Sequence, residues 1–281
     1  MLINLDAFAD QAVSSSLAYR QANPFPHIVV DDLFHLEPNV ADLFPKPEWD
    51  GWRALGDAYQ CKKFVCDDIQ RIPGPFSVLI DELSRPRFLR LLEKLTGIDG
   101  LLPDPYLTGG GLHLSGPGGI LAPHTDFHLY LHAGLYRRVN LILYLNEAWT
   151  EADGGCLEMW SDDEGTDREV IVPLWARCVI FTTDDQSIHG FPAPIADGKW
   201  RRSLALYYYT AVEAATFSGD STTYWRTHGQ KTGMSRARLR LYRTLIQASR
   251  CLSILAQFAN PNQGPRAWLR ARQDRSSTLG R

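Results

Sequence analysis

The chain has 281 residues, of which 44% are hydrophobic and 22% are charged, and its formal net charge is -3. This length allows one large domain or two small ones, and the ordinary globular composition argues against a disordered chain. Five scattered cysteines without a Cys-x-x-Cys pair argue against a disulfide scaffold and against a zinc ribbon.

The N-terminal third combines helical patterns with one short apolar run. Three helices are predicted, at residues 6–22, 37–44 and 75–97. Asn23-Pro24 ends the first helix, and Pro86 is expected to break or kink the last one. Residues 27–30 predict a short buried strand, and residues 50–72 are expected to form loops near the mouth of a site.

The middle of the chain has a different pattern. Short apolar runs bounded by Gly, Pro, Asp and Asn predict seven strands, at 110–115, 120–126, 137–146, 154–160, 169–173, 177–182 and 201–210. Many short strands with such turns indicate a sandwich or a barrel. An apolar stripe with interspersed arginines then predicts a helix at 235–258.

These elements predict an α+β chain with a mainly β core, flanked by N-terminal and C-terminal helices. We expect a helical and strand support region at 1–103, the core at 104–212 and a basic helical extension at 213–281. The N-terminus lacks a basic region followed by a long apolar stretch, and no apolar run approaches the length of a membrane span. We therefore expect no membrane span and a cytoplasmic location.

The segment that carries the most chemistry is His124-Thr125-Asp126. Residues two apart on a strand project to the same face, so His124 and Asp126 can reach one metal ion. His189, which follows an apolar strand and a polar loop, supplies a candidate third ligand. Two imidazoles and one carboxylate leave open coordination positions, a set that suits non-heme Fe(II).

A second cluster opens the predicted strand at 201–210. Arg201 and Ser203 share a face of this strand, whereas Arg202 points away. A guanidinium with a hydroxyl beside it is a good receptor for a carboxylate, because the planar fork binds both oxygens. A slip of one residue would exchange Arg201 for Arg202, and we favour Arg201.

The order of these motifs resembles the Fe(II)/2-oxoglutarate-dependent dioxygenases. The segments at 110–113, 118–127, 137–146 and 154–160 resemble the prolyl-4-hydroxylase-like branch, and the resemblance covers about 104–210. It implies a double-stranded β-helix, a jelly-roll or cupin-like barrel. It also implies that 2-oxoglutarate is decarboxylated to succinate and CO2 while O2 is used to hydroxylate an unactivated C–H bond.

The resemblance also implies the roles of individual residues. His124, Asp126 and His189 would ligate Fe(II), and Arg201 would bind the distal carboxylate of 2-oxoglutarate, with Tyr144 and Ser203 beside it. Halogenating relatives lack the carboxylate ligand, so Asp126 favours hydroxylation. Ascorbate is a candidate reductant for such enzymes.

Several alternatives stay open. His124, His128 and His132 have a spacing that could bind zinc on a helix, as in a zinc hydrolase, although Pro123 and the preceding glycines favour a strand. A non-catalytic barrel that binds a metal or a small acid is a second alternative. The substrate could be a prolyl residue, a free amino acid, a sugar, or a glycan- or lipid-linked small molecule.

Charge is unevenly distributed along the chain. From Arg226 to the end there are twelve Lys and Arg but a single acidic residue, Asp274. Such a segment could contact an acidic surface or dock on the acidic remainder of the chain. We expect no nucleic-acid partner.

Overall fold

The computed structural model describes residues 2–31, 33–36, 38–104, 106–131, 133–161, 167–214 and 223–225, together with residues 241, 244, 245, 248, 251 and 252. The chain divides into two compact units, Met1–His228 and Gly229–Arg281. In the second unit, the six described residues are helical and exposed, and all fall within the predicted helix at 235–258. The rest of that helix, and the basic residues from Arg226 onward, lie outside the described residues.

The N-terminal region of the first unit is a mixture of helices and short strands. Its elements are α1 (Leu5–Ser14), α2 (Ser16–Gln21), β1 (His27–Val30), the 3-10 helix η1 (Pro38–Leu43), β2 (Arg53–Leu55), β3 (Gln60–Cys66), α3 (Gly74–Ser84) and α4 (Pro86–Thr96). The predicted helix at 6–22 is two helices that meet at Ser15, and Pro86 begins a new helix as predicted. The expectation that residues 50–72 form only loops is wrong, because they contain β2 and β3.

The remaining elements build the core. They are β4 (Leu102–Pro103), β5 (Gly111–Thr125), β6 (Leu129–Tyr130), β7 (Leu135–Tyr144), the 3-10 helix η2 (Glu151–Asp153), β8 (Leu157–Trp160), β9 (Arg168–Ile171), β10 (Cys178–Thr182), β11 (Ile188–Phe191), β12 (Arg201–Thr210) and β13 (Tyr224–Trp225). Most of the predicted strands are confirmed, and 201–210 is observed with the predicted ends. The strands predicted at 110–115 and 120–126 are instead one continuous strand, because Gly118 bends β5 at a positive φ of 73° without ending it.

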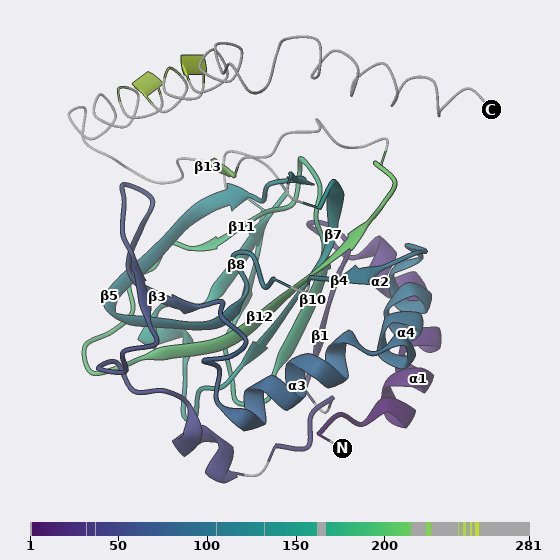
Figure 1. Cartoon of the computed structure of the whole chain (residues 1–281), viewed down its shortest axis with the longest axis horizontal. Helices are drawn as coiled ribbons and strands as arrows, with labels where there is room; N and C mark the ends of the chain where they lie inside the picture. The colour runs from purple at the N-terminus through teal and green to yellow at the C-terminus, as the bar shows by residue number, and fades with distance from the viewer. Residues whose placement is uncertain are drawn as a thin grey trace. The chain divides into compact units, whose positions relative to one another are not determined.

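The strands form one curled antiparallel sheet (Figure 1), which confirms the predicted mainly β core. Its main path runs β1-β10-β7-β12-β5-β11-β8-β9. The long strand β5 connects the two layers of the barrel, because its first half pairs with β12 and its second half pairs with β11. Strand β3 pairs along both halves of β5 and lies beside it in Figure 1.

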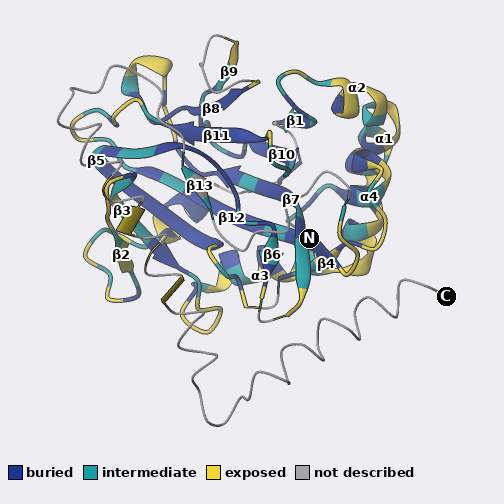
Figure 2. Cartoon of the chain, turned by 90° about the horizontal axis from the view of Figure 1, so that it is seen from above, coloured by how far each residue is buried: buried dark blue, intermediate teal, exposed yellow. Residues whose placement is uncertain are grey.

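Alternation along the strands separates two apolar layers. Leu141 and Leu143 of β7 face outward and pack with Leu204 of β12 against the buried side of α3 and α4. Tyr144 and Phe181 belong to a second buried cluster inside the barrel. Figure 2 shows the result, with strands largely buried and each helix exposed on its outer side. The helices therefore support one sheet from outside and leave the barrel interior available for a site.

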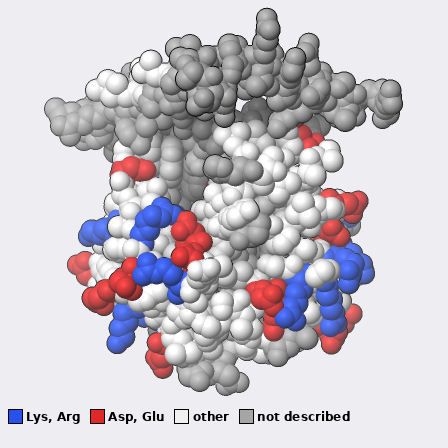
Figure 3. Space-filling model, viewed as in Figure 1, with Lys and Arg blue, Asp and Glu red and all other residues white. Residues whose placement is uncertain are grey.

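The described surface carries charge of both signs. On the face drawn in Figure 3, Lys and Arg side chains lie next to Asp and Glu side chains in mixed groups, with uncharged surface between the groups. Among the described helices, none combines the length and apolar character that a bilayer crossing requires.

Candidate metal centre and cosubstrate pocket

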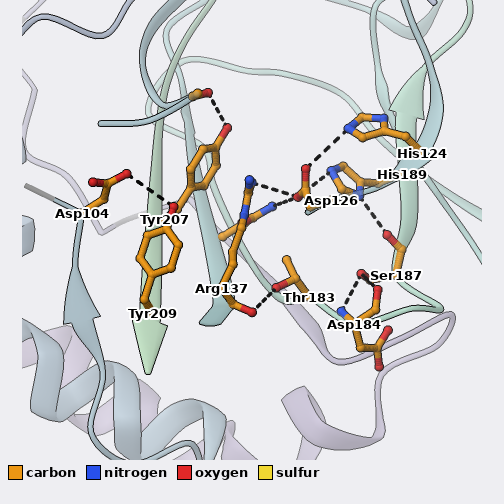
Figure 4. Close-up of polar contacts among 12 residues, drawn as sticks. Asp104, His124, Asp126, Arg137, Thr183, Asp184, Ser187, His189, Tyr207 and Tyr209 are labelled. Carbon is orange, nitrogen blue, oxygen red and sulfur yellow. Dashed lines mark hydrogen bonds and ion pairs between the residues drawn. The ribbon is translucent and has the colours of Figure 1, made fainter. Parts of the chain in front are cut away.

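Strands β5 and β11 bring the three predicted metal ligands together. The two strands are antiparallel neighbours, and His189 of β11 lies directly opposite His124 of β5. The two imidazole rings have centroids 4.5 Å apart. Asp126 directly follows β5, and its carboxylate faces both rings (Figure 4). All three residues are buried, and their candidate ligand atoms lie within 4.8 Å of one another.

Backbone carbonyls orient both imidazoles toward the carboxylate. Nδ1 of His124 bonds to the carbonyl of Ala122, and Nδ1 of His189 bonds to the carbonyl of Ser187, each at 2.9 Å. A carbonyl oxygen can only accept, so Nδ1 carries the proton in each ring and Nε2 is left with a lone pair. The Nε2 atoms lie 3.7 Å and 3.5 Å from the carboxylate oxygens of Asp126. This is the tautomer that a metal-binding histidine requires.

Burial sets the charge of the three groups. Burial, with a contribution from His189, lowers the pKa of His124 to about 3, and burial also lowers the pKa of His189. Burial alone would raise the pKa of Asp126, but Arg137 and the two histidines outweigh it and hold this pKa below its usual range. The site therefore presents two neutral imidazoles and one carboxylate.

Two residues of β7 hold the carboxylate in place. Arg137 Nη2 and Asn140 Nδ2 each donate to Asp126 Oδ2 at 2.8 Å. Arg137 Nε also donates to Asn140 Oδ1 at 2.8 Å, and its guanidinium lies 3.3 Å from the ring centroid of Tyr207. Because both bonds fall on Oδ2, Oδ1 remains for a metal ion.

The donor set fits a first-row divalent cation. Such ions bind nitrogen and oxygen ligands at about 2 Å, as zinc does, and each imidazole lies 3.5–3.7 Å from a carboxylate oxygen of Asp126, so an ion between the groups needs only small side-chain shifts to bind all three. Within the described part of the chain the group has two histidines, one carboxylate and no fourth protein ligand, which is the set that non-heme Fe(II) oxygenases use.

Arg201 lies in the same cavity as the triad. It is 5% exposed, donates from Nε to the carbonyl of Gly155 at 2.8 Å and from Nη2 to Tyr144 Oη at 3.2 Å. Gly155 has a positive φ of 63°, and a Cβ there would lie 3.3 Å from Arg201 Cδ, so glycine makes room for this contact. Arg202 is on the opposite face of β12, near the ring of Phe44.

The cavity has a volume of about 220 Å³. The triad lines it together with Arg201, Ser203 and Ser115. Apolar walls come from Ile142, Leu157 and Phe191, among other side chains. Of the predicted cosubstrate residues, Arg201 and Ser203 line the cavity, and Tyr144 is fully buried behind Arg201.

The two described histidines of the zinc alternative do not support a helical zinc site. His124 lies on a strand rather than a helix, and His128 is fully buried with its Nε2 2.7 Å from Asp185 Oδ1. His128 is not among the residues that line the cavity. His132 lies outside the described residues.

Three side chains of the site were not assigned a role from sequence: Arg137, Asn140 and Lys63, all of which line the cavity. Arg137 and Asn140 are an odd number of residues apart, so simple alternation places them on opposite faces. In the structure β7 has one extra residue, Arg138, that pairs with no residue of β12, and this bulge turns Arg137 toward Asn140. A single sequence carries no signal for that bulge.

Comparisons with known proteins agree with this geometry. Residues 110–210 match the family model of the 2OG-Fe(II) oxygenase superfamily. A prolyl 3-hydroxylase, OGFOD1 of Xenopus laevis, is 34% identical over 77 residues, which are 26% of this chain and 15% of that protein. The chain thus covers only a small part of that relative's length.

Two solved structures share the fold. A prolyl 4-hydroxylase from Phytophthora capsici superposes with a TM-score of 0.52 at 19% identity, covering 91% of this chain and 87% of that one. A prolyl hydroxylase from Trichoplax adhaerens, in complex with a hypoxia inducible factor peptide, gives a TM-score of 0.52 at 15% identity and covers 73% and 91%. The double-stranded β-helix and the resemblance to the 2-oxoglutarate oxygenases are therefore confirmed.

Proposed function

We propose that this chain is an Fe(II)- and 2-oxoglutarate-dependent dioxygenase that hydroxylates an unactivated C–H bond. The observation that carries the proposal is the convergence of His124, Asp126 and His189 in a cavity that also contains the buried cation Arg201. A metal-binding triad alone is compatible with many functions. A triad that shares its cavity with a carboxylate receptor fits a metal that works with a bound keto acid.

Different residues of the cavity would bind the metal ion and the cosubstrate. Iron, when bound with 2-oxoglutarate, supplies the activation of O2 and the conversion of 2-oxoglutarate to succinate and CO2. His124, Asp126 and His189 would hold it and leave the remaining coordination positions for cosubstrate and oxygen. Arg201 would bind the distal carboxylate with Ser203 beside it, and Tyr144 would orient the Arg201 guanidinium through its hydroxyl.

The surroundings of Arg201 suit that role. Its Nε is occupied by the Gly155 carbonyl, which fixes the plane of the guanidinium and leaves other N–H groups for a ligand. The cavity walls beside it are apolar at Ile142 and Leu157. Because water is displaced from such a wall on binding, the attraction between guanidinium and carboxylate is stronger than in bulk water.

The sequence and these relatives together support proposals for the substrate, the domain organisation and the cellular location. The substrate is a prolyl residue or a small molecule, as prolyl hydroxylases are among the relatives. Residues 104–212 form the catalytic core, 1–103 support it and 213–281 form a basic extension. All five cysteines are free thiols, which supports a reducing, cytoplasmic location.

Succinate release tests the proposal. The full chain, supplied with Fe(II), 2-oxoglutarate, O2 and ascorbate, is screened against proline peptides, free amino acids and sugars. We expect at least one class to stimulate succinate formation, and we expect Asp126→Ala to abolish it. Asp81→Ala, which removes an exposed carboxylate on α3, is the matched control and should retain it. Full turnover by Asp126→Ala would remove Asp126 from the ligand set.

A further inference from the structure

Strand β3 contains a bulge that turns two polar side chains into the cavity. Gln60 and Lys63 both line the cavity, although residues three apart on a regular strand face opposite sides. The pairing of β3 with β5 shifts register between Cys61 and Lys63. Lys62, at the centre of the shift, has a positive φ of 51° and an exposed side chain. A lysine in this backbone region is strained, and such strain is concentrated at functional sites.

Lys63 lies in a row with Arg201 across three neighbouring strands. Ser115 of β5 is opposite Lys63 of β3 on one side and opposite Arg201 of β12 on the other. All three side chains line the cavity. The cavity therefore has one cation on each side of Ser115, and Lys63 is the one that belongs to the β2–β3 hairpin.

The charges of the cavity are out of balance. Its described lining contains four basic side chains, Arg53, Lys63, Arg137 and Arg201, but a single acid, Asp126. Arg137 is balanced by Asp126, and Arg53 is paired with Asp67. A divalent cation would balance the two negative charges of 2-oxoglutarate. Within the described lining, Asp126 is the one acid, so none is left to pair with Lys63; Asp57, outside this lining, favours the ammonium form of Lys63, but burial outweighs it.

We propose that Lys63 binds an anionic group of the substrate, so that the enzyme acts on a small acid, a molecule with a carboxylate or a phosphate near the hydroxylated carbon. The inference rests on the proposed function and specifies the substrate class. Gln60 lies on the same wall and can donate a hydrogen bond from its amide to the same group. A neutral peptidyl proline would leave the excess positive charge uncompensated.

The electrostatics of Lys63 support this assignment. Burial, with a contribution from Arg201, lowers the pKa of Lys63 to about 8. The ammonium group is therefore less favourable here than in water, and an anion beside it would restore its stability. Lys62, one residue away, provides an exposed comparison within the same strand.

A binding experiment tests Lys63 without turnover. The full chain is loaded anaerobically with Mn(II) and 2-oxoglutarate, and inorganic phosphate or one of a set of free amino acids is added. Acetylation of Lys63 and Lys62 by an amine-reactive ester is then followed by peptide mass spectrometry. We expect at least one of these anions to slow the acetylation of Lys63 about tenfold and to leave Lys62 unchanged. An unchanged rate of Lys63 acetylation with every anion would overturn the proposal.

Turnover distinguishes this inference from the function itself. Succinate release is compared for free amino acids against their neutral amides, and for sugar phosphates against the free sugars. We expect the acids to be preferred, and Lys63→Gln to reduce that preference about 10- to 100-fold by removing a charge-assisted hydrogen bond. Lys62→Gln is the control and should keep it.

Three outcomes separate the possibilities. Stimulation by neutral peptides or amides as strong as by the acids would contradict the anionic substrate. A tenfold rise in the KM for 2-oxoglutarate in Lys63→Gln, without loss of substrate preference, would assign Lys63 to the cosubstrate and overturn the proposal. Absence of succinate with every compound would contradict the oxygenase function, while the labelling experiment would still decide whether Lys63 binds an anion.

Discussion

The buried pair of Arg137 and Asp126 gives the most quantitative prediction. Arg137 is 3% exposed and Asp126 is 6% exposed, and Arg137 Nη2 lies 2.8 Å from Asp126 Oδ2. Removing one partner of a buried ion pair leaves an uncompensated charge and costs about 3–5 kcal/mol. Arg137→Met keeps most of the apolar stem that packs on Tyr207 and removes only the charged end. For a unit of this size, that free energy lowers the Tm by about 6–20 °C.

Thermal unfolding followed by circular dichroism, in the presence of a chelator, measures this effect. The double variant Asp126→Asn/Arg137→Met removes both charges and should recover much of the lost stability. Arg202→Met, on the opposite face of β12, is the control and should cost at most about 1 kcal/mol. A Tm for Arg137→Met within 2 °C of the parent (roughly the effect of 1 kcal/mol or less) would show that the buried pair does not stabilise the fold, as would a double variant as unstable as the single one.

Three further predictions concern the cosubstrate pocket and the supporting core. Arg201→Ala should raise the KM for 2-oxoglutarate about 10- to 150-fold, because it removes a charge-assisted contact with the distal carboxylate. Arg202→Ala is the control and should leave this KM unchanged. The reverse result would place the carboxylate on the other face of β12. Gly155→Ala places a Cβ 2.8 Å from Ile195 Cγ1 at a positive φ, so it should lower the free energy of unfolding by at least about 1 kcal/mol and weaken 2-oxoglutarate binding. Unchanged 2-oxoglutarate binding would show that the Gly155 carbonyl does not position Arg201. Phe88→Ala removes a fully buried ring that stacks on Phe8, so it should lower the free energy of unfolding in urea by about 3–5 kcal/mol. At low temperature, where this variant is still folded, its metal affinity should be unchanged. A lower metal affinity would mean that α4 does more than support the sheet.

Local patterns predicted the parts of the fold whose apolar runs are long and uninterrupted. The strand at 201–210 contains a continuous apolar and aromatic run from Leu204 to Tyr209, and its predicted ends are the observed ones. Strand β3 was missed because Lys62 and Lys63 interrupt the apolar alternation and the bulge at Lys62 changes its phase. The glycines and proline at 116–119 are typical of a turn, yet pairing on both sides keeps β5 continuous through them.

Some residues of the candidate site could likewise be predicted from local sequence, and others could not. His124 and Asp126 are close in sequence, and strand geometry alone places them together. That His189 lies opposite His124 depends on the order of strands, which the family resemblance supplied and local pattern did not. The support by Arg137 and the position of Lys63 both depend on bulges, which are set by pairing between distant strands and are not visible along one of them.

Titration with Fe(II) shows whether His124, Asp126 and His189 form a metal site. Under anaerobic conditions, equilibrium titration of the full chain with Fe(II) should give one ion per chain, and addition of 2-oxoglutarate should produce a weak visible charge-transfer band. His189→Ala should abolish both, and His35→Ala, at an exposed histidine, should abolish neither. Undiminished Fe(II) binding by His189→Ala, with the band retained, would contradict the account.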